Sequence, residues 1–121
     1  MFDVILDGIF GFSFNSSSAI RPPFDRVIAD LVATDVPVAS IDIPSGWDVE
    51  QGDVRGLGLM PDMLISLTAP KLCSQFFTGQ HHYLGGRFVP PYIVEKYGLH
   101  DLPAYKGTDQ IVRLNLKSDE L

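Results

Sequence analysis

The chain carries three short apolar runs, and polar residues follow each of them. The runs occupy residues 4–6, 36–43 and 63–67, and they consist mostly of aliphatic and β-branched residues. Short runs of this kind are typical of strands, so we predict a fully buried strand at the first run and further buried strands at the other two. The polar residues at their carboxyl ends are, in chain order, Asp7, Asp42 with Ser45, and Thr68 with Lys71.

A pattern with helical spacing separates the first two runs. Apolar residues recur there at intervals of three and four, namely Phe24, Val27, Ile28, Leu31 and Val32. This spacing predicts a helix with one apolar face, and Pro22 and Pro23 suit its first turn. A strand, a helix and a second strand in this order form a crossover, so the two strands should be parallel. We therefore predict an α/β fold with a mainly parallel sheet.

Shorter elements are predicted beyond residue 68. In chain order we expect a short helix over residues 72–79, a glycine turn feeding a strand over residues 84–90, a short helix over residues 91–97, and an edge strand over residues 111–114. We interpret His81, His82 and Tyr83 as a surface or interface patch. No linker divides the chain, so residues 1–121 are predicted to form one domain.

The carboxyl ends of parallel strands meet at one edge of a sheet, where open α/β folds bind ligands. Asp7 and Ser45 can ligate a hard cation there through oxygen atoms, and Asp7 can equally accept N–H groups of its own turn. Asp42 is a candidate general acid or base if burial favours its neutral form, with a structural bond to the backbone as the alternative. Lys71 can pair with Asp42, bind a phosphate or be a solvated surface lysine.

Composition narrows the classes of partner. The chain has 121 residues, a formal net charge of −6 and one cysteine, Cys73. The negative charge disfavours nucleic acid and anionic membranes as main partners, and we expect neither. One cysteine excludes an internal disulfide framework and a cysteine-rich zinc site. No segment of the sequence is long and apolar enough to span a bilayer.

Four stretches resemble a known family. They are VILDGIFGFSF (residues 4–14), SIDIPSGWDVE (residues 40–50), PDMLISLTAPK (residues 61–71) and LGGRFVP (residues 84–90). Together they resemble the NAD(P)H-hydrate epimerase family, also described as apolipoprotein A-I-binding protein or the YjeF N-terminal domain. The resemblance implies a three-layer α/β/α sandwich of Rossmann type, usually a homodimer. It also implies interconversion of the R and S forms of NADHX and NADPHX, with one potassium ion per subunit.

The resemblance implies roles for individual residues. Asp7 and Ser45 match potassium ligands, and Asp42 matches a direct substrate contact. The loop that contacts the substrate matches Gly11, Phe12, Ser13, Phe14, Asn15, Ser16 and Ser17. Asp42 is the first choice as the catalytic proton carrier. Lys71 is a secondary catalytic candidate, which would hold Asp42 charged or neutral.

The sequence also departs from the family pattern. The family carries an upstream half with an Asn-Asn-Gly-Gly-Asp-Gly loop, which supplies another potassium ligand and is missing here. The chain therefore resembles the C-terminal half to two-thirds of the domain, and we expect an exposed sheet edge and poor stability. The alternatives to an epimerase are a non-enzymatic module that binds an apolipoprotein A-I-like partner, and an inactive truncated fragment. We expect a cytoplasmic or mitochondrial location, and we interpret the C-terminal Ser-Asp-Glu-Leu as a chance likeness to an ER-retention signal.

Overall fold

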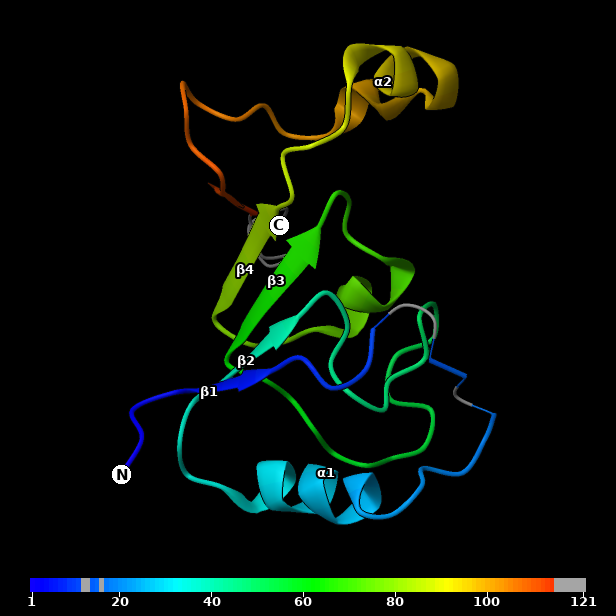
Figure 1. The fold of residues 1–121 in the computed structure, drawn as a ribbon, viewed down its shortest axis with the longest axis vertical. Helices are drawn as coiled ribbons and strands as arrows, with labels where there is room; N and C mark the ends of the chain where they lie inside the picture. The colour runs from blue at the N-terminus through cyan, green and yellow to red at the C-terminus, as the bar shows by residue number, and fades with distance from the viewer. Residues whose placement is uncertain (12–13, 16, 115–121) are drawn as a thin grey trace.

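A computed structural model describes residues 1–11, 14–15 and 17–114 and shows a five-stranded sheet (Figure 1). The strands are β1 (Ile5–Asp7), β2 (Val38–Ile41), β3 (Met63–Leu67), β4 (His81–Gly85) and β5 (Val112–Arg113). They lie in the order β1-β2-β3-β4-β5, with β1 to β4 parallel and β5 antiparallel to β4. The α/β class and the mainly parallel, Rossmann-like sheet are thereby confirmed.

Two α-helices and two 3₁₀ turns connect these strands. They are α1 (Phe24–Ala33), η1 (Leu72–Phe76), α2 (Pro91–Tyr97) and η2 (Leu99–Asp101). The helical spacing predicted α1 correctly, and the predicted short helices correspond to η1 and α2. Figure 1 shows α2 beyond the arrowheads of β3 and β4, whereas α1 lies at the opposite end of the view.

One row of residues runs across four strands and is buried. The parallel register places Asp7 opposite Ser40, Ser40 opposite Leu64, and Leu64 opposite His82. Each of these residues is at most 8% exposed. Three of the four are polar, so this row depends on hydrogen bonds as well as apolar contact for its stability.

The segments that follow β2 and β3 supply the core next to this row. Ile43, Trp47 and Cys73 form one buried cluster. The indole N–H of Trp47 donates to the carbonyl oxygen of Leu59 at 2.9 Å, which ties together the long loop over residues 45–61. The ring of Phe77 meets the ring of His82 edge-on at 5.7 Å. The long loop and η1 therefore pack together through Trp47 and Cys73, whereas Leu72 and Phe76 of η1 are exposed.

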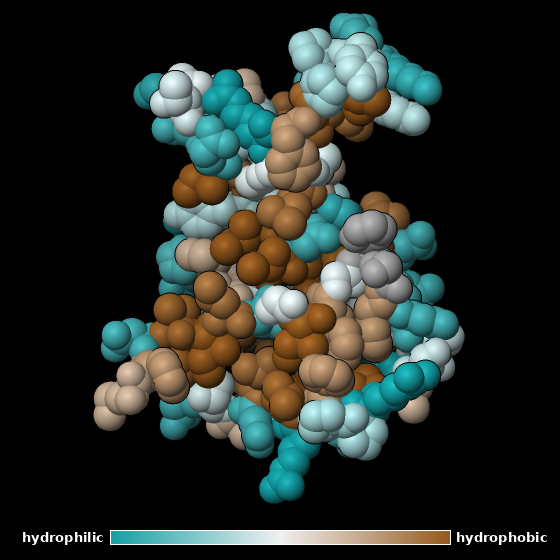
Figure 2. Space-filling model, viewed as in Figure 1, coloured by the Kyte–Doolittle hydropathy of each residue, from teal (hydrophilic) through white to brown (hydrophobic). Residues whose placement is uncertain are grey.

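The prediction that the first strand is fully buried is wrong. Val4 and Leu6 are 52% and 65% exposed, and Asp7 is the buried residue of β1. β1 is an outer strand of the described sheet and pairs there with β2, so its other edge stays open. Figure 2 shows apolar side chains gathered on the surface over the sheet. The expected exposed edge is present in the described residues.

The prediction of a strand after the glycine turn is also wrong. The strand β4 comes before the turn, and Gly86, with a φ of 76°, follows its last residue. All five residues of β4 pair with β3, so His81, His82 and Tyr83 belong to the sheet instead of a surface patch. The Nε2 atom of buried His82 lies 2.8 Å from the hydroxyl oxygen of Ser66.

Candidate functional site

Two residues with left-handed backbone stand at the carboxyl ends of β2 and β3. Asp42 has a φ of 67° and Thr68 a φ of 68°. The predicted strand over residues 36–43 is therefore shorter in the structure, because the chain leaves the extended conformation at Asp42. A positive φ is uncommon for residues other than glycine and strained for a β-branched residue, and such strain clusters at functional sites.

The carboxylate of Asp7 is held by groups from β2 and from the turn after it. Its Oδ2 atom accepts hydrogen bonds from the Ser40 hydroxyl at 2.7 Å and from the Ser45 backbone N–H at 2.9 Å. Its Oδ1 atom accepts from the Ser45 hydroxyl. The bond from its own turn, donated by the N–H of Ile9, is long at 3.4 Å. Asp7 thus joins β1 to the turn after β2. Its bonds extend beyond its own turn, which was the alternative role considered from the sequence.

The Asp7 carboxylate has no cationic side chain beside it in the described part of the chain. Asp7 is 1% exposed, and the ion pairs between described residues involve other groups. A buried carboxylate is costly unless a positive charge or several hydrogen bonds compensate it. The oxygen atoms of Asp7, Ser40 and Ser45 form a donor set of the kind that hard cations prefer. The oxygen chemistry of these residues fits a hard cation, and in this structure four hydrogen-bond donors already compensate the Asp7 carboxylate. Across the described ranges no group of three or more His, Cys, Asp or Glu side chains could hold a metal.

Asp42 forms a second network, directed toward β3. Its Oδ1 atom accepts from the Lys71 ammonium at 2.9 Å and from the Leu67 backbone N–H at 3.3 Å. The same ammonium donates to the carbonyl oxygens of Leu67 at 2.9 Å and Ala69 at 3.0 Å. An ammonium has three donors, so these acceptors occupy Lys71 fully. Of the three roles open to Lys71, the structure selects pairing with Asp42.

The two networks lie where the sequence predicted the ligand site, along the carboxyl ends of β1, β2 and β3, which we call the rim. They lie on opposite sides of the end of β2. Asp7 and Ser45 connect it to β1, whereas Asp42 and Lys71 connect it to β3. No hydrogen bond between described residues joins one network to the other. The Oδ2 atom of Asp42 has no hydrogen-bond partner among the described residues.

The predicted substrate loop borders this rim, and part of it is described. Phe12, Ser13 and Ser16 lie outside the described residues, whereas Gly11, Phe14, Asn15 and Ser17 lie within them. Asn15 Oδ1 accepts from the backbone N–H and the hydroxyl of Ser17 at 3.0 and 2.6 Å. Gly11 is exposed and accepts at its carbonyl oxygen from the N–H of Phe14.

Aromatic rings line a cavity of about 270 Å³ next to this loop. Phe10 stacks on Phe14 with ring centres 4.4 Å apart and meets Phe24 edge-on at 5.7 Å. The N–H of Phe10 donates to the Ser45 hydroxyl at 3.1 Å, which places the cavity beside the Asp7 network. Sequence reasoning did not assign Phe10 and Phe24 to the site. The alternation of phenylalanine with small residues near residue 10 was the available signal.

Two buried titratable groups lie behind the rim. Burial and the nearby negative charge of Asp42 raise the pKa of the Cys73 thiol to about 11. Cys73 is therefore a neutral thiol near pH 7 and unsuited to act as a nucleophile. Burial also lowers the pKa of His82 below its usual value. The neutral imidazole suits its hydrogen bond with Ser66 inside the sheet.

A family model described as YjeF-related protein N-terminus matches residues 1–73, which include Asp7, Asp42, Ser45 and Lys71. This match covers more than half of the chain. The chain belongs to the YjeF-related family.

Two relatives support this membership. The crystal structure of the yeast protein YNL200c superposes with a TM-score of 0.84 at 39% sequence identity, covering 93% of this chain and 46% of that one. A protein of Arabidopsis thaliana named pyridoxine/pyridoxamine 5'-phosphate oxidase 1, chloroplastic, is 54% identical over 122 residues. That alignment covers 93% of this chain and 22% of the plant protein. The chain thus spans less than half the length of either relative.

The described residues also bear on membrane association. No helix among them has the length and apolar character needed to cross a membrane.

Proposed function

We propose that this member of the YjeF-related family interconverts the R and S forms of NADHX and NADPHX. The observation that carries the proposal is the state of Asp42. Its backbone is held at a positive φ, Lys71 and Leu67 occupy its Oδ1 atom, and its Oδ2 atom has no partner among the described residues. A carboxylate held in one orientation with one open oxygen is suited to exchange a proton with a bound substrate.

The proposal includes one potassium ion per subunit, held by Asp7 and Ser45. The support is the buried carboxylate of Asp7, which lacks a cationic partner among the described side chains and shares its surroundings with two hydroxyl groups. When bound, the ion supplies positive charge that compensates this carboxylate and orients oxygen atoms of the substrate. Hydroxyl and carboxylate oxygens, with no sulfur or imidazole nearby in the network, favour such a hard cation over zinc.

The proposal assigns substrate contact to the loop over residues 11–17 and to the aromatic cavity beside it. The stacked rings of Phe10 and Phe14 present an apolar wall, and an aromatic wall suits a flat nucleotide base or nicotinamide ring. Asn15 offers hydrogen-bonding groups at the edge of the same cavity. Gly11, Phe12, Ser13, Ser16 and Ser17 complete the proposed contact loop.

The proposed reaction moves one proton through Asp42. Asp42 first takes up a proton from solvent at Oδ2, the oxygen that Lys71 does not contact. It gives this proton to the ring hydroxyl while the C–O bond breaks, so water leaves and the ring becomes a cation stabilised by its nitrogen. Water then adds to the opposite face of the same carbon and returns a proton to the Asp42 carboxylate. We assign Lys71 a positioning role, because its ammonium binds Oδ1 and leaves Oδ2 for the proposed proton transfer.

A direct assay tests this proposal. A single purified epimer of NADHX is incubated with the protein in potassium buffer, and both epimers are followed by chromatography. Interconversion well above the spontaneous rate supports the proposal. A rate equal to that of buffer alone, from protein with the circular dichroism of an α/β fold, would contradict it.

A protein-binding module is the second candidate. The open edge of β1 and the exposed side chains of Val4 and Leu6 favour association with another polypeptide. The proposed partners are a second copy of the chain, as in a homodimer, and an apolipoprotein A-I-like protein. Capture of purified apolipoprotein A-I by the wild-type chain, and loss of capture with Leu6→Asp, would support this candidate.

The location of the protein is also a proposal. Nicotinamide nucleotides are repaired where they are used, so the cytoplasm and mitochondria remain our first candidates. The Arabidopsis relative is named as chloroplastic. An organelle location for this chain is therefore part of the proposal, to be tested by imaging of a tagged protein.

A further inference from the structure

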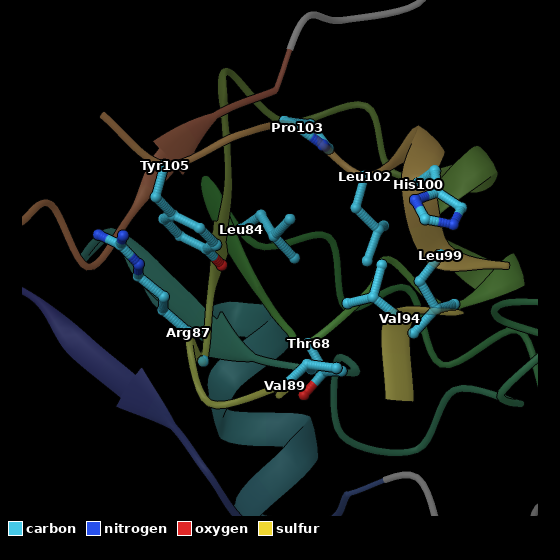
Figure 3. Close-up of a pocket in the computed structure, with 11 residues that line it drawn as sticks. Thr68, Leu84, Arg87, Val89, Val94, Leu99, His100, Leu102, Pro103 and Tyr105 are labelled. Carbon is cyan, nitrogen blue, oxygen red and sulfur yellow. The ribbon is translucent and has the colours of Figure 1, made fainter. Parts of the chain in front are cut away.

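A second cavity lies at the carboxyl ends of β3 and β4, apart from the Asp7 and Asp42 networks. It measures about 330 Å³, which lies within the range of small-molecule sites. Figure 3 shows its walls: Leu84 from β4, Val94 from α2, Leu99 and Leu102 around η2, and Tyr105. Segments about 20 residues apart in the sequence thus line one cavity. This cavity is larger than the cavities that bind a single benzene ring.

The walls of this cavity are mainly apolar. Leu84 is 1% exposed, and Val94, Leu99 and Leu102 are half-buried. Thr68 lines the cavity as well. The carbonyl oxygens of its two neighbours, Leu67 and Ala69, accept from Lys71, so the turn at Thr68 separates the cavity from the Asp42 ion pair.

One polar group at the cavity lacks a partner. The hydroxyl of Tyr105 is buried and makes no hydrogen bond with any described residue. Figure 3 shows the hydroxyl end of Tyr105 directed toward the side of the cavity that holds Leu84. A buried hydroxyl without a partner is unfavourable, and a ligand that supplies the missing hydrogen bond would gain from it.

The cation nearest the cavity is already engaged. The guanidinium of Arg87 lies over the ring of Tyr105 at 5.4 Å. Its Nη1 atom donates to the carbonyl oxygens of Gly107 at 2.6 Å and Asp109 at 3.1 Å. Figure 3 shows this guanidinium against the tyrosine ring and outside the space between Leu84 and Val94. Arg87 therefore holds Tyr105 in place. His100 also lines the cavity, and its Nε2 atom lies 3.6 Å from the Glu95 carboxylate, so both basic side chains of the described lining already have partners.

We propose that this cavity is a second binding site, which takes a neutral aromatic heterocycle of one or two rings. The apolar walls receive the flat faces of the rings, and a polar atom on the ring edge bonds to the Tyr105 hydroxyl. A hydroxyl both donates and accepts, so it can bond a ring N–H or a ring nitrogen. The site is distinct from the proposed catalytic rim and does not depend on the proposed reaction.

Indole and indene test the proposal, because they have nearly the same shape and indole alone carries an N–H. Titration of the methyl-labelled full chain with indole is expected to shift the methyl resonances of Leu84, Val94 and Leu99 and to leave those of Ile28 in α1 unchanged. Tyr105→Phe should weaken indole about fivefold, the value of one ordinary neutral hydrogen bond, and leave indene unchanged.

Two variants at one position control for folding and space. Val94→Trp fills the cavity and should abolish indole binding, whereas Val94→Ala enlarges it and should retain binding. If Val94→Trp fails to fold, the Tyr105→Phe comparison decides alone. The proposal is wrong if saturating indole shifts none of the cavity methyls of the folded wild-type chain. It is equally wrong if Tyr105→Phe weakens indole and indene alike.

Discussion

The Nζ atom of Lys71 lies 2.9 Å from the Oδ1 atom of Asp42, and the same ammonium binds the carbonyl oxygens on both sides of Thr68. One lysine therefore connects the strained ends of β2 and β3. The Lys71 side chain is 26% exposed and that of Asp42 is 10% exposed, so solvent screens this ion pair only in part. This ammonium holds the ends of β2 and β3 together with two backbone bonds, from the Leu67 N–H to Asp42 Oδ1 and from the Asp42 N–H to the Ile65 carbonyl oxygen.

Replacing Lys71 should disturb both stability and turnover. Lys71→Met removes three hydrogen bonds to a partly buried ammonium, and we expect a loss of about 2 kcal/mol in the free energy of unfolding. Because Asp42 loses its orientation, kcat should fall about tenfold or more while KM changes little. Urea unfolding and steady-state kinetics measure the two effects. The matched control is Lys106→Met at an exposed position. A variant with an unchanged kcat would show that Lys71 does not position Asp42.

Removing the Asp7 carboxylate should remove any response to potassium. An ion that binds only the folded state raises the melting temperature as its concentration rises. We therefore expect potassium to stabilise the wild-type chain more than tetramethylammonium does, and Asp7→Asn to abolish the difference. Asp3→Asn, at an exposed position on the same segment, is the control. Equal melting temperatures of the wild-type chain in the two salts would remove Asp7 and Ser45 from the list of potassium ligands.

The sequence predicted β1, β2 and β3, their parallel order and their shared rim, because each of these three strands combines a short apolar run with an abrupt polar end. Burial could not be predicted in the same way. Leu6 is apolar and exposed, since β1 is an outer strand of the described sheet, whereas polar Asp7 beside it is buried through bonds to distant Ser40 and Ser45. These partners are 33 and 38 residues away, and no local pattern reveals them.

The error at β4 has a related cause. In the sequence, His81, His82 and Tyr83 are typical of an exposed polar segment. The glycines after them were interpreted as a turn, so the strand was predicted after that turn instead of before it. Pairing with β3 over five residues determines the strand instead, and Phe77 and Ser66 accommodate the buried His82 ring. Contacts made by tertiary structure outweighed local preference at this position.

The chain should lose stability at alkaline pH because of Cys73. Its thiol ionises near pH 9 when unfolded, whereas burial raises its pKa to about 11 in the folded chain. Between these values the unfolded state binds fewer protons, so stability falls as pH rises, by up to about 3 kcal/mol in total. Urea unfolding between pH 8 and pH 11 measures this slope. Cys73→Ala should flatten the alkaline slope, and an unchanged slope in that variant would contradict the assignment.

His82 should have the opposite effect on the acid side. Burial lowers its pKa in the folded chain, so below about pH 6.5 the unfolded state takes up a proton that the folded state resists. Stability should therefore fall as pH falls, by at most about 1.4 kcal/mol per pH unit. His82→Gln should reduce this slope between pH 6.5 and pH 5, and His100→Gln, at an exposed position, should leave it intact. Identical slopes in both variants would mean that His82 is not the responsible group.

The Asp42→Asn variant gives the most direct test of the proposed epimerase. Asparagine tolerates a positive φ and keeps the shape of the side chain, so the backbone at Asp42 should be preserved while the proton carrier is lost. The measurement is the rate at which a single NADHX epimer converts to the other in potassium buffer, for the wild-type chain and the variant. We expect the wild-type chain to accelerate the conversion and Asp42→Asn to lower its kcat at least about a hundredfold. A folded Asp42→Asn variant with wild-type turnover would contradict the proposed role of Asp42.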